Sequence, residues 1–294
     1  MRWSSFRLVP LLAALAFVGC GRRPSVERLE WPSMGTIAAV QGRTAAADEL
    51  AAAFVCAQES FARVNAEFSR FDSQSTLRRL GRVTAFGQPC WDAALWLRTA
   101  SGTAFDPFWR GAGVPDFGAI AKGFAVDVAA EAVTGAGDLL IDLGGTVKAV
   151  RGDWTTGVKN PRGGGIAAVV TLRAGEALAT SAEYFRGKHI CDGRTGQPVS
   201  NGVASVTVLC PSAMWADGLS TTLFVLGPEA GRRFLVERLA VSSMGTDPAF
   251  EGTDPMGTGP GTRLGTGPAV LWLLDDGCAV AVDPAARFRL TSRP

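Results

Sequence analysis

The sequence predicts an α+β fold in a single domain, with mixed or antiparallel sheets and flanking helices. Strand and helix patterns are interspersed without the strict βαβ alternation of a doubly wound sheet. A Gly144-Gly145 turn follows a buried strand but lacks the G-x-G-x-x-G spacing, so a Rossmann dinucleotide site is not supported. The chain has 294 residues, enough for one large domain or two small ones.

The first twenty residues have the organisation of an export signal. Arg2 and Arg7 form a short positive region, and the apolar run over 8–18 is too short to span a bilayer stably. The run ends at Gly19-Cys20, which resembles the end of a bacterial lipoprotein signal, where the cysteine is acylated. Phe17 departs from that pattern, and an uncleaved signal anchor is the alternative.

These features predict where the chain resides. We expect a signal peptide over 1–20, a tether over 21–30 and a lipid anchor at Cys20. The rest of the chain is then exported and attached to a bacterial membrane, facing the periplasm or the cell exterior.

Apolar residues at three- and four-residue spacing predict six helices. The longest is marked by Leu50, Phe54 and Phe61. Asp116 lies just ahead of another apolar run, in a position suited to capping, so we expect that helix to begin at about Gly118. The longest helix is expected over 45–67, and the remaining helices after a cap at Asp72 or Ser73 and over 93–101, 214–226 and 228–239.

Short runs of β-branched and apolar residues predict the strands. A buried strand, a glycine turn and a second strand are expected over 138–150, and a hairpin over 269–282. Residues 242–268 are rich in Gly, Thr and Pro, which predicts a low-complexity insertion that cannot bury a core. Further strands are expected over 31–40, 153–158, 167–172, 177–185 and 204–209.

Composition excludes several classes of function. The formal net charge is +2, which gives no electrostatic footprint for nucleic acid. His189 is the one histidine, so a multi-histidine metal site is excluded, and there is no G-x-S-x-G elbow of a serine hydrolase. None of the six cysteines forms C-x-x-C, so a zinc ribbon or a thioredoxin-type motif is not supported.

Three polar sets are candidates for chemistry. Asp116 and Lys122 flank a helix start, where free N–H groups and the helix dipole attract an anion. Asp217 and Thr221 are four residues apart on a predicted helix and suit an oxygen-loving cation such as Mg²⁺. The turn 189–198 holds a histidine, an aspartate and an arginine. Taken alone, the first set favours a surface lysine and the second a helix cap, and the third is compatible with a tight turn and a solvated arginine.

Nine short motifs occur in an order that resembles the ApbE family of FAD:protein FMN transferases. The resemblance runs from about Ser33 to Gly227, with a weaker continuation over 269–282, and implies one ApbE-like domain over 31–290. The motifs are S-M-G-T at 33–36, F-S-R-F-D-S at 68–73, A-F-D-P at 104–107, D-F-G-A-I-A-K-G-F-A-V-D at 116–127, L-I-D-L-G-G at 140–145, A-T-S at 179–181, H-I-C-D-G-R-T-G-Q-P-V at 189–199, S-V-T-V at 205–208 and A-D-G-L-S-T-T-L-F-V-L-G at 216–227.

The resemblance implies an activity and its cofactors. Such enzymes bind FAD with Mg²⁺, break its pyrophosphate, transfer FMN to a threonine of an exported target protein and release AMP. A base is needed near the threonine hydroxyl, and His189 and Asp217 both remain candidates. The alternatives are an FAD pyrophosphatase that releases FMN and AMP, and a non-catalytic FAD-binding lipoprotein.

The resemblance also implies site residues, one position at a time. Metal ligands match Asp217 and Thr221, with Ser220 as an additional ligand and Ala119 contributing its backbone oxygen. Positions at the flavin or elsewhere on FAD match Met34, Phe71, Ala104, Phe105, Asp106, Asp116, Lys122 and Cys191.

Three features depart from the family pattern. Only residues 108–115 separate two motifs that usually lie several dozen residues apart, and the longer segment helps to wall the FAD pocket. Cys191 stands where isoleucine is usual, and Gly193 replaces a proline. The shortened segment therefore puts full affinity for FAD in question.

Overall fold

The computed structural model describes residues 26–43, 47–111, 113–183, 187, 189–240 and 267–291. The predicted signal peptide, residues 21–25 of the predicted tether and most of the predicted insertion lie outside these residues. Among the described helices, none is both long and apolar enough to cross a membrane.

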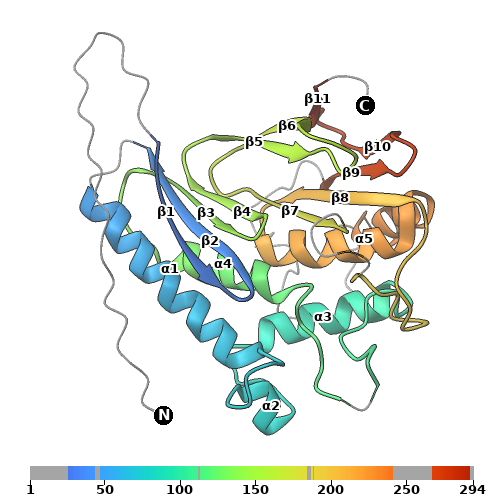
Figure 1. Ribbon diagram of the computed structural model, residues 1–294, viewed down its shortest axis with the longest axis horizontal. Helices are drawn as coiled ribbons and strands as arrows, with labels where there is room; N and C mark the ends of the chain where they lie inside the picture. Colours follow the sequence, from blue (N-terminus) through green and yellow to red (C-terminus); the bar gives the residue numbers. More distant parts are fainter. Residues whose placement is uncertain are drawn as a thin grey trace.

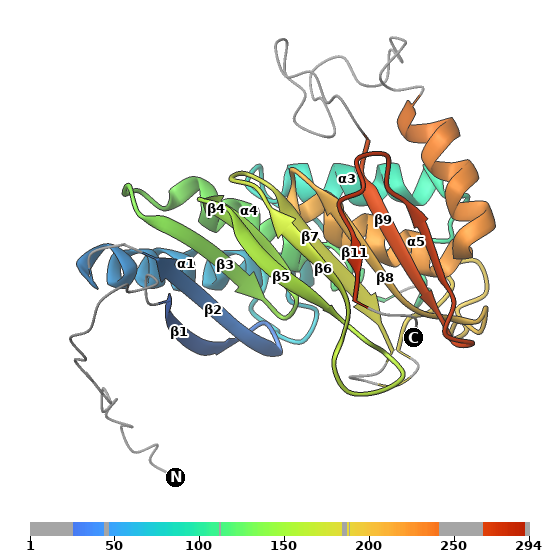
Figure 2. The ribbon, with the colours of Figure 1, turned by 90° about the horizontal axis from the view of Figure 1, so that it is seen from above.

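An eight-stranded antiparallel sheet forms the centre of the molecule (Figure 2). Its order is β1-β2-β3-β4-β7-β8-β9-β10, so the first two strands lie at one edge and the last two at the other. The strands are β1 (Val26–Ser33), β2 (Thr36–Arg43), β3 (Asp138–Leu143), β4 (Thr146–Arg151), β7 (Ala177–Ala182), β8 (Val203–Cys210), β9 (Ala269–Leu274) and β10 (Ala279–Val282).

Helices cover one face of this sheet (Figure 1). The side chains of Ile141, Val208 and Trp272 point to that face and join a single core with the helices, in which Phe61 and Leu219 are fully buried. The helices are α1 (Ala47–Phe68), α2 (Thr76–Leu80), α3 (Gln88–Ala100), α4 (Ala121–Ala132) and α5 (Ala213–Phe234), followed by the π-helix η1 (Leu235–Ala240).

A second, three-stranded sheet covers the other face. It consists of β11 (Arg289–Leu290), β6 (Ile166–Leu172) and β5 (Trp154–Lys159). Successive residues of a strand point to opposite faces, so Leu140, Leu178 and Leu271 pack with Trp154 rather than with the helices. The predicted α+β class is confirmed, and the described sheets are antiparallel.

The predicted tether is wrong from residue 26 onward. Val26 begins β1, which pairs with β2 along its full length to Ser33. Its residues Glu27, Arg28 and Glu30 are charged and exposed, as is typical of an edge strand.

Three predicted helix starts are wrong. The short helix is capped by Ser75, whose side chain accepts from Arg78 N, and not by Asp72 or Ser73. The helix expected from residue 93 begins at Gln88, with a proline in its first turn. The helix expected from Gly118 begins at Ala121, because residues 117–120 form a separate turn in which Phe117 O accepts from Ile120 N.

The two helices predicted over 214–226 and 228–239 meet at Gly227. Its φ of 74° and ψ of 175° lie outside the helical region, so α5 is kinked there. Pro228 follows, and proline tolerates the first position after such a break.

The carboxyl of Asp142 should make the free energy of unfolding depend measurably on pH. Burial raises the pKa of its carboxyl, although Gly145 N donates to Oδ1 at 3.1 Å and Arg28 lies beside Oδ2. A carboxyl whose pKa is higher in the folded state favours folding below its unfolded pKa, and that contribution is lost as pH rises through the folded pKa.

We therefore expect Asp142→Asn, which keeps an acceptor for Gly145 N, to be at least as stable as the wild type at pH 7. The difference in free energy of unfolding should shrink as pH falls toward 4, measured by urea denaturation at several pH values. A clear loss of stability at pH 7 would show that the Arg28 pairing outweighs the cost of burial.

Candidate functional site

The candidate site lies where α4 meets the first turn of α5. A Cβ built on Gly123 would lie 2.2 Å from Ala213 O and 2.7 Å from Met214 Cα. Only glycine permits so close an approach of two backbones, and this contact brings Asp217 to the start of α4.

Asp217 is the anion held at this helix start. Its side chain is buried, and Gly123 N donates to Oδ2 at 3.0 Å. Lys122 Nζ lies 3.4 Å from both carboxylate oxygens and donates to Gly118 O at 3.0 Å. The predicted anion-binding helix start is thus occupied by a carboxylate of the same chain, with the predicted lysine beside it.

Hydroxyl groups gather next to Asp217. Ser181 Oγ, on β7, lies 2.8 Å from Ser220 Oγ and 2.9 Å from Thr221 Oγ1. Ser220 Oγ also donates to Asp217 O at 2.9 Å. The structure therefore brings the predicted ligands Asp217, Ser220 and Thr221 together, and adds Ser181.

The donor set has the chemistry of a hard-cation site. One carboxylate and several hydroxyls are oxygen ligands of the kind that Mg²⁺ prefers, and the ammonium of Lys122 already places a cation beside Asp217. Among the described residues, no three His, Cys, Asp or Glu side chains form a cluster. A metal ion at this place therefore depends on hydroxyl and carbonyl oxygens as well as on Asp217.

The turn before α4 carries Asp116 and Ala119. Asp116 Oδ1 accepts from Gly118 N at 3.0 Å, so the side chain caps this turn and not the helix. Oδ2 faces Arg70 Nε at 3.1 Å and Arg110 Nε at 3.5 Å. Ala119 is half-buried and directly follows Gly118, whose carbonyl accepts from Lys122.

The loop 189–199 packs on the loop that contains residues 104–106. Gly193 N donates to Ala104 O at 3.1 Å, and a Cβ on Gly193 would lie 2.3 Å from Thr103 O. Glycine in place of the usual proline thus permits this close contact. The side chains of Ala104 and Phe105 are buried in the core, so an FAD contact there would use their backbone atoms.

Cys191 and Asp106 lie in these two loops. Burial raises the pKa of the Cys191 thiol, Arg110 opposes that change, and Asp116 and Glu183 reinforce it. Cys191 therefore lies close enough to Arg110 and Asp116 to interact with their charges. Asp106 Oδ1 accepts from Arg98 Nε and from Phe108 N, both at 2.9 Å, which fixes the start of the short segment 108–115.

Three more predicted site residues lie in turns and loops outside α4 and α5. Met34 lies in the turn between β1 and β2, with φ of 45°. The ring of Phe71 is 81% exposed, and Arg70 Cζ lies 4.1 Å from its centroid. His189 is exposed, and its Nδ1 lies 2.8 Å from Gly187 O.

Comparison with known proteins shows a similarity to one family over part of the chain. A family model described as "ApbE family" matches residues 114–243, which include Asp116, Lys122, His189 and Asp217. This part of the chain is similar to the ApbE family.

Curated relatives match part of the chain. An "FAD:protein FMN transferase" of Rhodobacter capsulatus is 40% identical over 129 residues, which is 39% of this chain and 24% of that protein. One of Vibrio cholerae is 36% identical over 132 residues, 40% of each chain. The matched part therefore spans well under two thirds of the length of these relatives.

Solved ApbE structures share the fold over most of the chain. The flavin transferase ApbE of Vibrio cholerae has a TM-score of 0.68 at 21% identity, covering 88% of this chain and 97% of that one. The ApbE protein of Thermotoga maritima has a TM-score of 0.66 at 21% identity, covering 87% and 96%. The fold thus extends beyond the part in which the sequence match is recognised.

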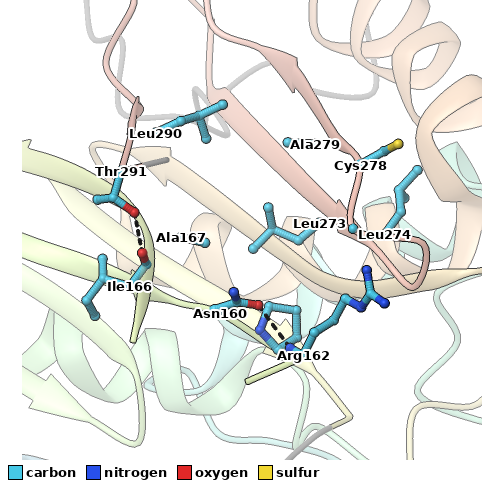
Figure 3. Close-up of a pocket in the computed structure, with 12 residues that line it drawn as sticks. Asn160, Arg162, Ile166, Ala167, Leu273, Leu274, Cys278, Ala279, Leu290 and Thr291 are labelled. Atoms are coloured by element: carbon cyan, nitrogen blue, oxygen red, sulfur yellow. Dashed lines mark hydrogen bonds between the residues drawn. The ribbon is translucent and has the colours of Figure 1, made fainter. Parts of the chain in front are cut away.

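A surface pocket of this chain lies away from the residues described above (Figure 3). Asn160 and Arg162 follow β5, Cys278 lies in the β9–β10 turn, and Leu290 and Thr291 come from the C-terminal strand and the residue after it. None of the predicted site residues lines this pocket.

Two residues that support this site could not be recognised from the sequence. Asp127 ends a quoted motif, and its carboxylate caps α5 from outside that helix by accepting from Ala213 N and Met214 N. Ser181 ends the A-T-S motif and contacts two predicted metal ligands. Both act on residues more than thirty positions away, so local spacing carries no signal of their partners.

Gly123→Ala tests the contact of α4 with α5. Alanine favours a helix, but its Cβ would strike the backbone at Ala213, so we expect a net loss of about 1–3 kcal/mol in the free energy of unfolding. Urea denaturation measures it. Gly163→Ala is the matched control, because its added Cβ meets no atom within 4 Å; equal stability of the two variants would contradict the close contact.

Proposed function

We propose that this protein transfers the FMN moiety of FAD to a threonine of an exported protein and releases AMP. The single observation that carries the proposal is the Asp217 arrangement. Its buried carboxylate lies at the start of α4 with Lys122 beside it. Ser220 and Thr221, on the same helix as Asp217, share a hydroxyl cluster with Ser181. The curated relatives are named FAD:protein FMN transferases, which supports the same reaction.

Mg²⁺ is part of this proposal. Asp217, Ser220 and Thr221 would hold the ion, together with the backbone oxygen of Ala119. When bound, the ion supplies neutralisation of the pyrophosphate charge, which is the main requirement of this type of transfer. Lys122 and the N–H groups at the start of α4 add positive potential at the same place.

His189 is the better candidate for the base that accepts the threonine proton. A carbonyl oxygen only accepts, so the contact with Gly187 O places the hydrogen of a neutral imidazole on Nδ1 and leaves Nε2 free to take a proton. His189 is exposed, where a protein substrate can approach, whereas the Asp217 oxygens already accept from Gly123 and Lys122.

The proposal extends to the location of the enzyme. The signal pattern over 1–20 and Cys20 support export and a lipid anchor on a bacterial membrane. An exported flavoprotein with an acceptor threonine would then be the partner, on the same side of the membrane.

Incubation of the full chain with FAD, MgCl₂ and an exported flavoprotein that carries an acceptor threonine tests the activity. We expect covalent flavin fluorescence on the target in a denaturing gel, together with AMP, and no product with EDTA. AMP without labelled target would favour an FAD pyrophosphatase, and bound FAD without either product would favour a flavin-binding lipoprotein. Mutation of the acceptor threonine to alanine is the control for the attachment site.

A further inference from the structure

Two arginines converge on one oxygen at the edge of the candidate site. Asp116 Oδ2 lies 3.1 Å from Arg70 Nε and 3.5 Å from Arg110 Nε, while Oδ1 accepts from Gly118 N. Each guanidinium group carries several N–H donors, more than this one oxygen can accept, so donors remain for a second anion at this partly exposed place.

Both arginines are held in place with part of each guanidinium unused. Arg70 Cζ lies 4.1 Å from the centroid of Phe71, and Arg110 Cζ lies 4.0 Å from the ring of Trp109. The ion pairs with Asp116 run through Nε of both side chains. Among the described residues, the terminal nitrogens of these two groups have no other recorded acceptor, and such a planar fork suits phosphate oxygens.

Arg110 is brought there by the short segment that follows Pro107. Asp116 N donates to Pro107 O at 2.8 Å, which joins the two ends of the segment and turns Arg110 back toward Asp116. A Cβ on Gly196 would lie 3.7 Å from Trp109 O, so the segment also adjoins the loop that holds Cys191.

The arginine pair is connected to the Asp217 arrangement by successive contacts. Asp116 accepts from Gly118 N, Gly118 O accepts from Lys122 Nζ, and Lys122 contacts Asp217. The cations of Arg70, Arg110 and Lys122 therefore all contact the turn that contains Asp116 and Gly118. A ligand with more than one negative charge would meet them together.

We infer that Arg110, with Arg70, binds a phosphate group of FAD, and that Asp116 acts as the positioning residue that aligns the two guanidinium groups. The inference rests on the proposed function. Arg70 and Arg110 are the residues that distinguish FAD, which carries phosphate groups, from an uncharged flavin. The short segment thereby contributes a charged contact to the site.

Calorimetric titration of the full chain with FAD and, separately, with riboflavin tests this role. Arg110→Gln should weaken FAD binding by about 10- to 100-fold, as expected for a lost charged hydrogen bond, and leave riboflavin binding unchanged. Arg110→Lys should lie between them, because lysine keeps the charge without the fork. Arg233→Gln, an exposed arginine near the other end of α5, is the matched control and should bind both flavins as the wild type does.

The outcomes separate this inference from the proposed function. Equal FAD affinity of Arg110→Gln and the wild type overturns the inference and leaves the function standing. An equal loss of affinity for FAD and for riboflavin also overturns the inference, since Arg110 would then contribute packing and not phosphate binding. A wild type that binds neither flavin overturns the proposed function itself. If circular dichroism shows that Arg110→Gln does not fold, Arg110→Lys decides the question. In that variant, an unchanged ratio of the affinities for FAD and riboflavin contradicts recognition of phosphate by the planar guanidinium group.

Discussion

Asp217→Asn should lower the rate of FMN transfer by about a thousand-fold and leave the fold intact. The asparagine oxygen still accepts from Gly123 N, but the negative charge that would hold Mg²⁺ is lost. A metal ion contributes several kcal/mol of charge stabilisation to such a transfer, and each 1.36 kcal/mol is a factor of ten in rate. The initial rate of covalent flavin labelling at saturating FAD and MgCl₂ measures the loss.

Two measurements keep this prediction specific. Asp276→Asn removes the charge of an exposed aspartate in the β9–β10 turn and should transfer FMN at the wild-type rate. Titration of the protein with Mg²⁺ should show weaker binding to Asp217→Asn alone. A variant at Asp217 that kept its full magnesium-dependent rate would refute the assignment of this residue to the metal.

Asp127→Ala should reduce the free energy of unfolding by about 3–5 kcal/mol, the range for removing one partner of a largely buried ion pair. The carboxylate accepts from Lys148 Nζ and Ser212 Oγ at 2.7 Å each, from Met214 N at 2.9 Å and from Ala213 N at 3.0 Å. Its removal leaves a lysine that is only 17% exposed and two N–H groups at the start of α5 without this acceptor.

Chemical denaturation in urea measures that loss. Asp127→Asn retains an acceptor without the charge and should lose less stability than Asp127→Ala. The matched control is Asp92→Ala, because Asp92 is exposed on α3 and its side chain contacts Gln88 of the same helix. A loss below about 1 kcal/mol for Asp127→Ala, typical of an exposed ion pair, would contradict the buried role.

Elements that depend on local sequence could be predicted. The Gly144-Gly145 turn and its two strands are confirmed, because glycine permits the positive φ angles of 61° and 91° found there. The helix start near Gly118 was misplaced, since a turn and a first helical turn share the same residue types. β1 was missed because its strand character comes from pairing with β2, which the charged residues at 27–30 do not reveal.

The candidate site was predictable only in the part that depends on local sequence. Asp217 and Thr221 are four residues apart, and helical spacing alone places them on one side of α5. Their partners Ser181 and Lys122 come from β7 and α4, and no local pattern connects them to α5. The roles of Met34, Phe71 and His189 stay predictions that rest on the motifs.

The order of strands limits how the chain can be shortened. Residues 114–243, which match the family model, supply the adjacent strands β3, β4, β7 and β8, whereas β2 and β9 flank them from outside that range. An excised fragment of this range would expose two unpaired sheet edges and the apolar helices once covered by α1. We expect such a fragment to aggregate, so a minimal active enzyme must keep both the first and the last strands of the large sheet.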